Sequence, residues 1–453
     1  MRRRPTILPD YFGNCGPKDR QSRCMTFGSG HWPSNMIFSC VPATRTSIIY
    51  RRSRCSVNHM KVLFVSNLYP NRCDTERGIF NAYQIQNLAK LSEVKVVAPI
   101  AWFPIRGHYA PKGKVPALET IAGIEVHHPR HFYLPKIARQ FNAALYAAGI
   151  TARLQQIQRE FPFDILFANW TYPDGCGVAK LASRFRVPFV VSVSGSDAHL
   201  YLTFRIRRRQ ILRMFEAARA IMTRSQDLKD MLLAYGVPAA KVHVVYNGVD
   251  QRRFSSVPRE ALRQKLGWDS HDRVLLFVGR LSPEKGADDL LRAYAHARRY
   301  YEIAGRVVIV GDGPERSSLE QLAQHLGIQD QVTWAGWKRP AEVSEYMNAA
   351  DVLCLSSHNE GVANVVLEAF SCGIPVVATA MGGIPEIMTP ATGVLASPKQ
   401  PESFAAALSK ALQKKWDAAA IRAQAAHYNW SSNAAQVQAI LQQAIADFKA
   451  KKE

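Results

Sequence analysis

The sequence lacks any run of about 18 consecutive apolar residues, the length that a membrane-spanning helix requires. It begins with Met-Arg-Arg-Arg-Pro and has no apolar core near that start, so it shows no secretory signal peptide. Its eight cysteines include no CxxC pair, which argues against a zinc ribbon or a thioredoxin-like site. We therefore predict a cytoplasmic protein whose thiols are reduced and mostly buried.

Acidic residues are also scarce. The chain has 36 Asp and Glu against 58 Lys and Arg, which gives a formal net charge of +22. Residues 1–59 contribute +8, residues 60–250 contribute +12 and residues 251–453 contribute only +2. The excess lies in the first half of the chain, where it favours an anionic partner such as phospholipid, lipid diphosphate or nucleic acid. No nucleic-acid recognition motif or aromatic stacking repeat is present, so we do not expect a nucleic-acid partner.

Residues 1–59 differ from the rest of the sequence. They are rich in Arg, Ser, Pro and Cys and show no sustained hydrophobic period. Met60 then opens an apolar strand followed by a turn, MKVLFVSNLYPN, as a Rossmann-type domain does. We interpret residues 1–59 as a disordered or non-native leader, with an Arg-rich transit peptide as the alternative.

From Met60 onward, strand and helix patterns alternate in two series, which predicts two α/β domains with parallel sheets covered by helices on both faces. The region 100–135 is expected to be a long connection or a β-rich insert, and 247–258 a linker. The predicted domains are 60–250 and 251–430, followed by a last helix in 431–453. The predicted strands are Val62–Ser66, Val94–Ala98, Asp164–Ala168, Phe189–Val193, Ala220–Thr223, Val242–Val245, one starting at Val274, Val307–Val310, Val332–Trp334, Val352–Leu355 and Val376–Ala378.

The most informative stretch is Asn359–Phe370, NEGVANVVLEAF, in which two carboxylates flank a loop that turns into an apolar helix. The start of a helix offers unpaired N–H groups and a positive dipole end, which attract phosphate. An ionised carboxylate such as that of Glu368 only accepts hydrogen bonds, so it suits the hydroxyl pair of a ribose. Together these features indicate a nucleotide-sugar site.

This stretch resembles the signature of the family 4 retaining glycosyltransferases, which have the GT-B architecture. Four further motifs follow the family's order: YNGVD at Tyr246–Asp250, VGRLSPEKG at Val278–Gly286, GDGPE at Gly311–Glu315 and CGIPVVATAMGGIPEI at Cys372–Ile387. The resemblance implies two Rossmann-like domains facing a cleft, with the C-terminal helix crossing back onto the first domain. It also implies that the donor binds mainly to the second domain and the acceptor to the first.

The resemblance assigns roles to individual residues. Arg280 and Lys285 would clamp the diphosphate, Glu360 would contact the donor sugar, and Glu368 would bind the ribose. Asp197 is a candidate sugar or acceptor contact, although capping the following helix would explain it equally well. The family often has His where this chain has Ser194, so a step that depends on that His is in doubt. The residues expected to face the donor through backbone or tight turns are Gly361, Val362, Ala363, Asn364, Val365, Gly311, Gly313 and Gly78, with Arg77 and Asn67 beside the last of these.

The implied activity is transfer of a sugar, with retention, from a nucleotide-diphosphate donor, expected to be UDP-linked. Similarity to bacterial polysaccharide-assembly members suggests a glycan or polyprenyl-linked acceptor. No metal or other cofactor is expected, because no DxD motif occurs in a matching context and GDGPE lacks the third glycine of a dinucleotide fingerprint. Another GT-B enzyme, an epimerase or a phosphorylase, and a non-enzymatic nucleic-acid-binding protein remain alternatives.

A basic amphipathic segment in the first domain is a candidate for contact with an anionic membrane. Four of its arginines, at 205, 208, 209 and 213, alternate with apolar residues at near-helical spacing. Each cation would contribute about 1 kcal/mol near an anionic surface. An ordinary surface helix with solvated arginines is the alternative. The chain is thus expected to be cytoplasmic. If this segment binds lipid, the protein is expected to be peripheral on the inner face of the plasma membrane.

Overall fold

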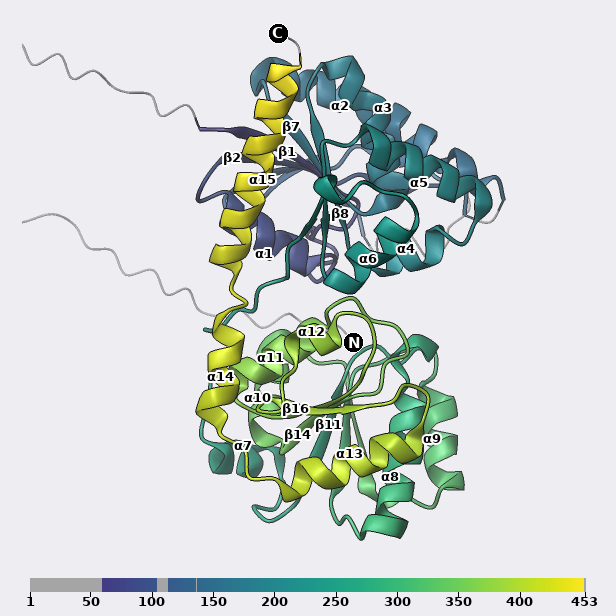
Figure 1. Ribbon diagram of the computed structural model, residues 1–453, viewed down its shortest axis with the longest axis vertical. Helices are drawn as coiled ribbons and strands as arrows, with labels where there is room; N and C mark the ends of the chain where they lie inside the picture. The colour runs from purple at the N-terminus through teal and green to yellow at the C-terminus, as the bar shows by residue number, and fades with distance from the viewer. Residues whose placement is uncertain (1–58, 104–112, 136, 452–453) are drawn as a thin grey trace, which may run out of the picture. The chain divides into compact units, whose positions relative to one another are not determined.

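The computed structural model describes residues 59–103, 113–135 and 137–451, and they belong to one compact unit, 57–453. The leader predicted for residues 1–59 lies, apart from His59, outside the described residues. Two sheets organise the described chain (Figure 1).

The first sheet has eight strands in the order β10-β9-β8-β7-β1-β2-β5-β4. All neighbours pair in parallel except β4 and β5. Every residue of β7 and β8 is buried, as expected for central parallel strands covered on both faces. The strands are β1 (Lys61–Val65), β2 (Glu93–Val97), β4 (Leu118–Ile121), β5 (Ile124–His127), β7 (Ile165–Asn169), β8 (Phe189–Val193), β9 (Ala220–Thr223) and β10 (Val242–Val244).

Helices cover both faces of this sheet. One core lies under α2, α3, α4, α5 and α6, and a second lies under α1 and α15. A separate two-stranded parallel pair, β3 (Ile100–Trp102) and β6 (Arg130–Phe132), completes the β-rich insert predicted near 100–135. The helices are α1 (Ile79–Leu88), α2 (Asn142–Glu160), α3 (Cys176–Phe185), α4 (Ser196–Tyr201), α5 (Arg205–Ala217) and α6 (Gln226–Ala234).

The second sheet has six strands, all parallel, in the order β13-β12-β11-β14-β15-β16. Helices α8, α9 and α13 cover one face, and α7, α10, α11 and α14 cover the other (Figure 1). Its strands are β11 (Val274–Val278), β12 (Arg306–Val310), β13 (Val332–Gly336), β14 (Val352–Leu355), β15 (Val376–Thr379) and β16 (Gly393–Ala396). Its helices are α7 (Arg259–Leu266), α8 (Ala287–Tyr301), α9 (Arg316–His325), α10 (Pro340–Ala349), α11 (Asn364–Cys372), α12 (Ile384–Ile387), α13 (Pro401–Gln413) and α14 (Ala418–Ala426).

The last helix, α15 (Trp430–Ala450), leaves the second domain and packs against the first. Val437, Leu441 and Ala444 enter the core that also contains residues of α1 and the first sheet. The predicted fold class, two doubly wound parallel sheets with a returning C-terminal helix, is confirmed. The strand β16 was not predicted, and the domain boundaries at 250 and 430 stay predictions.

Candidate active site

The start of helix α11 opens onto a cleft. Ala363 precedes the helix in an extended conformation, no side chain caps the helix, and its first turn contains no acidic residue. In the part of the chain that the structure describes, the amide groups and the positive end of the helix dipole therefore have neither a capping side chain nor a first-turn carboxylate. Gly361, Val362 and Asn364 line the adjacent cleft, whose volume is about 330 Å³. This arrangement can receive a phosphate group.

Glu360 and Lys285 form an ion pair in the same cleft. The Lys285 Nζ lies 2.5 Å from Glu360 Oε1, and the Ser357 hydroxyl donates to the same oxygen at 2.9 Å. Both side chains line the cleft; the Lys285 side chain is 29% exposed and that of Glu360 is 10% exposed. A diphosphate bound here could share the Lys285 cation with Glu360, and this would leave the carboxylate free to accept a hydrogen bond from a sugar hydroxyl.

The two loops that carry these residues are joined by hydrogen bonds. Ser356 Oγ donates to the Gly286 carbonyl at 2.6 Å, and the His358 amide donates to the Glu284 carbonyl at 2.9 Å. Gly286 has a φ of 62°, and a Cβ there would clash with the Ser356 carbonyl. The Lys285 loop and the Glu360 loop are thus fixed relative to one another.

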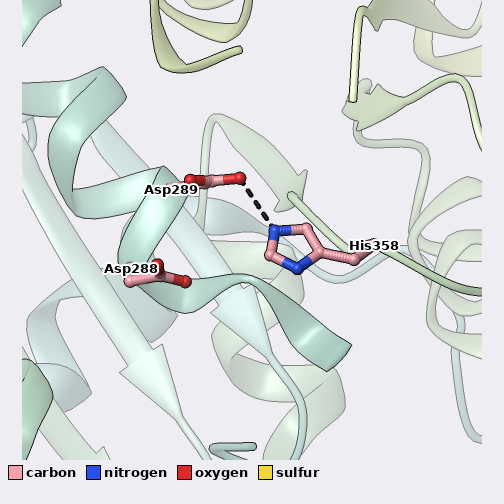
Figure 2. Close-up of side chains that lie close together, drawn as sticks. All are labelled: Asp288, Asp289 and His358. Carbon is pink, nitrogen blue, oxygen red and sulfur yellow. Dashed lines mark hydrogen bonds and ion pairs between the residues drawn. The ribbon is translucent and has the colours of Figure 1, made fainter. Parts of the chain in front are cut away.

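Three side chains beside these loops have the donor types that a divalent cation binds (Figure 2). Asp288, Asp289 and His358 place ligand atoms within 4.8 Å of one another, and His358 Nε2 lies 2.8 Å from Asp289 Oδ2. Both aspartates lie in the first turn of α8, where negative charge stabilises the helix dipole. We therefore interpret these three side chains as groups that hold the loop leading to Glu360 in position.

The glycines of the GDGPE motif pack closely against the backbone of the loop that leads to Lys285. A Cβ at Gly311 would clash with the Gly279 carbonyl, and one at Gly313 with the Leu281 carbonyl. The Leu281 amide donates to the Asp312 carbonyl at 3.0 Å. Neither glycine lines the cleft, and Arg280 is exposed and also absent from its lining. Their predicted contacts with the donor stay predictions.

Gly78, directly before helix α1, forms part of the opposite wall of the cleft. It precedes α1 with a φ of 61°, and a Cβ there would clash with the Leu68 carbonyl. Nearby, the Arg77 Nε donates to the Asn67 carbonyl at 2.8 Å, and the Asn67 amide donates to the buried Asp174. Gly78 lines the cleft, whereas Arg77 and Asn67 shape the turn behind it.

Asp197 lies behind the cleft wall and does not contribute to its lining. Its side chain is fully buried, and it accepts hydrogen bonds from the amides of Thr171 at 2.7 Å and of Ser194 and Gly195 at 3.0 Å. Burial raises the pKa of this carboxyl, and the three amides partly oppose that shift. This geometry supports a structural role in holding the Ser194 loop, and the direct contact of Asp197 with substrate stays a prediction.

Glu368 lies one turn after Asn364 on α11 and does not contribute to the lining of the described cleft. Its carboxylate makes no hydrogen bond or ion pair with the described residues, although Arg253 acts on it electrostatically. Burial raises the pKa of Glu368 to about 7. Ala363 and Val365 also lie outside the lining. The predicted ribose contact of Glu368 is therefore not tested by this geometry.

Sequence reasoning missed several residues of the cleft. Leu68, Phe80, Asn81, Ser196 and Arg224 line it from the first domain. At the start of the predicted linker, Asn247 also lines the cleft and donates from Nδ2 to Asn364 Oδ1 at 3.0 Å. Of these residues, Leu68 lies in the quoted stretch MKVLFVSNLYPN and Asn247 in YNGVD, but neither was predicted to face the cleft. The others come together through the strand order, which no local pattern reveals.

Two family sequence profiles match adjoining parts of the chain. The profile described as Glycosyltransferase Family 4 matches residues 63–253, and the profile described as Glycosyl transferases group 1 matches residues 258–428. One match thus covers the first sheet, and the other covers the second sheet with the α11 region.

Curated relatives carry glycosyltransferase names. A Bacillus subtilis protein named for teichuronic acid biosynthesis, TuaC, is 26% identical over 360 residues, which cover 78% of this chain and 89% of that protein. A D-inositol 3-phosphate glycosyltransferase of Mycobacteroides abscessus is 34% identical over 245 residues, covering 52% of this chain and 54% of that protein. The chain thus spans about half the length of this second relative.

Solved structures share the fold. Sucrose-phosphate synthase from Thermosynechococcus elongatus superposes with a TM-score of 0.69 at 20% identity, covering 86% of this chain and all of that one. HepE of Anabaena, crystallised with UDP, superposes with a TM-score of 0.64 at 22% identity, covering 85% of this chain and all of that one. At this identity the likeness concerns the fold alone.

Proposed function

Because this chain belongs to the group 1 and family 4 glycosyltransferases, we propose that it transfers a sugar from a nucleoside diphosphate donor, UDP-linked, to a glycan or lipid-linked acceptor. The observation that carries this proposal is the shared cleft of the unneutralised α11 start and the Glu360–Lys285 pair. Support for UDP comes from HepE, which was crystallised with UDP and with UDP-glucose.

The proposed reaction proceeds with retention on one face of the sugar. The bond between the anomeric carbon and the diphosphate oxygen breaks while the acceptor oxygen attacks from the same side, and the leaving diphosphate takes the acceptor proton. Lys285, Arg280 and the start of α11 would stabilise the charge that develops on the diphosphate. Neither a metal nor a further cofactor is part of this proposal.

The acceptor side of the proposal is broader. The name of TuaC refers to teichuronic acid biosynthesis, which supports an envelope polysaccharide as the product class. The acceptor would lie against the first domain, where Gly78, Asn81, Ser194 and Ser196 line the cleft.

A peripheral membrane site is a further part of the proposal. Helix α5 exposes Arg205, Arg209 and Arg213, and the apolar Phe204 and Ile206 are 48% and 58% exposed beside them. Among the described residues, no helix combines the length and apolar composition that crossing a bilayer requires. A lipid-linked acceptor would be reached by a protein that rests on an anionic surface through α5.

The test is a calorimetric panel of UDP-, GDP-, ADP- and TDP-sugars against the parent and Lys285→Met. We expect one nucleotide series to bind the parent, and the methionine variant to bind it at least about tenfold more weakly, because a cation in contact with the diphosphate is lost. Arg184→Gln, an exposed change on α3, is the control. Absence of binding by every nucleotide sugar would contradict the proposal.

A further inference from the structure

Arg224 is a cation in the wall of the cleft that forms no ion pair with a carboxylate of the described residues. It directly follows β9 and is only 5% exposed. Its Nη2 donates to Gln84 Oε1 at 3.3 Å, whereas its Nη1 is buried and has no hydrogen-bond partner among the described residues. A buried charge with an unused donor is costly unless a partner arrives.

The charges around Arg224 leave it available to an anion. Burial lowers the pKa of Arg224 to about 10, so the guanidinium stays charged at neutral pH. The acidic group that acts on it electrostatically is Asp197, whose two oxygens already accept three amide hydrogen bonds. The other cation of the described lining, Lys285, is paired with Glu360.

The guanidinium is also held in place. The Gln84 side chain that accepts from Arg224 donates from Nε2 to Asn433 Oδ1 at 2.8 Å. Asn433 in turn donates to the Tyr246 carbonyl at 2.6 Å, so the returning helix α15 fixes the position of Gln84. A group whose position is fixed before binding loses little conformational entropy when a ligand arrives.

We propose that Arg224 is a receptor for a phosphate group of a bound substrate. This inference rests on the proposed function and adds a binding residue on the first-domain wall. A guanidinium presents paired N–H donors that match phosphate oxygens. Arg224 belongs to the wall opposite Lys285 and α11, which favours a phosphate of the acceptor, and the donor diphosphate is the other source of the same chemistry.

Isothermal calorimetry on the parent, Arg224→Gln and the matched control Arg184→Gln separates the two sources. Inorganic pyrophosphate is titrated into protein saturated with UDP, and UDP and uridine are titrated separately. For an acceptor phosphate, Arg224→Gln should weaken pyrophosphate binding at least about tenfold and leave UDP binding unchanged. For the donor diphosphate, UDP binding should weaken by that factor while uridine binding is unchanged.

Unchanged binding of both pyrophosphate and UDP in folded Arg224→Gln would overturn the proposal. Since Arg224 forms no ion pair with a carboxylate of the described residues, the glutamine variant should melt no lower than the parent. If it does not fold, Arg224→Lys keeps the charge without the paired donors, and it should show an intermediate loss of the same affinity. A parent that binds pyrophosphate but not UDP would refute the proposed donor while still testing Arg224, so the two failures can be told apart.

Discussion

At the scale of single residues, the two predicted site carboxyl groups, Glu368 and Asp197, lie in different environments. Asp197 is surrounded by amide donors that satisfy both of its oxygens. Glu368 has no hydrogen-bond partner among the described residues, and its pKa is raised to about 7 from an ordinary 4.5. A carboxylate that is costly to ionise and unpaired in the free protein is suited to bind a ligand's hydroxyl groups.

Glu368 should make stability depend on pH. Because the folded protein holds this proton more tightly than the unfolded chain, stability should fall as pH rises from about 4.5 through about 7. Glu368→Gln removes the ionisation, so the variant should exceed the parent in free energy of unfolding by about 3 kcal/mol at pH 8 and by almost nothing near pH 4. Urea denaturation at the two pH values measures this, and a difference that is independent of pH would contradict it.

The same titration should appear in donor binding with the opposite sign. If the ionised Glu368 accepts ribose hydroxyls, the affinity of the parent for UDP should fall as pH drops below about 7. Glu368→Gln should bind UDP about tenfold more weakly at pH 8 and lose this pH dependence. The measurement is calorimetry from about pH 5.5 to about pH 8, a range that brackets neutral pH. Repeating it in buffers of different ionisation enthalpy separates the protonation of the buffer from that of the protein.

Asp197→Asn should disturb the Ser194 loop without removing any group from the cleft lining. The amide nitrogen of asparagine cannot accept from Thr171 while its oxygen accepts from Ser194 and Gly195, so at least one buried amide loses its partner. We expect a loss of about 1–3 kcal/mol in the free energy of unfolding. Thermal and urea unfolding check this, and unchanged stability together with lost sugar transfer would instead restore a direct catalytic role.

At the scale of elements, helix α11 begins without either of the two groups that commonly neutralise the N-terminus of a helix. Most helices neutralise their N-terminus with a capping side chain or an early acidic residue, and α11 has neither. By contrast, α8 begins with Asp288 and Asp289. Helix α11, whose start lies at the cleft, therefore keeps its positive end available for a phosphate group.

Asn364→Asp tests this arrangement with an isosteric change. The new carboxylate can still accept the hydrogen bond from Asn247 Nδ2, and its charge should stabilise the helix by about 0.3–1 kcal/mol. The same charge should repel a diphosphate and weaken UDP binding at least about tenfold. Melting temperature and UDP affinity should thus move in opposite directions, and a variant that binds UDP as well as the parent would argue against phosphate at this helix start.

At the scale of the whole molecule, α15 couples the second domain to the first. Its apolar face fills part of the core beneath the first sheet, and Gln438 donates to the Leu91 carbonyl at 2.7 Å. The Glu386 carboxylate of α12 accepts from the amides of Gln226 and Asp227 at 2.7 and 2.8 Å, which caps α6 from the second domain. Stability of the first domain therefore depends on residues distant in sequence.

Leu441→Ala should destabilise the first domain although position 441 lies near the C-terminus. Leu441 is fully buried, and its truncation removes packing and leaves a cavity, with an expected cost of about 2–5 kcal/mol. Urea unfolding followed by Trp fluorescence measures the loss. Gln442→Ala on the exposed face of α15 should leave stability unchanged within about 0.5 kcal/mol. Equal effects of the two variants would show that the helix is not anchored through its apolar face.

The sequence by itself determined the alternation of strands and helices and the loop-to-helix signature around Glu360, because hydrophobic period and glycine placement are local properties. Most predicted strands lie within two residues of those observed, whereas β16 was missed, since Gly393–Ala396 is short and begins with glycine. The sequence could not place Arg224 beside Gln84, or Asp197 behind the cleft, because those neighbours follow from strand order and from the return of α15. Burial, which raises the pKa of Glu368 and leaves Arg224 Nη1 without a hydrogen-bond partner among the described residues, exists only once the tertiary structure has formed.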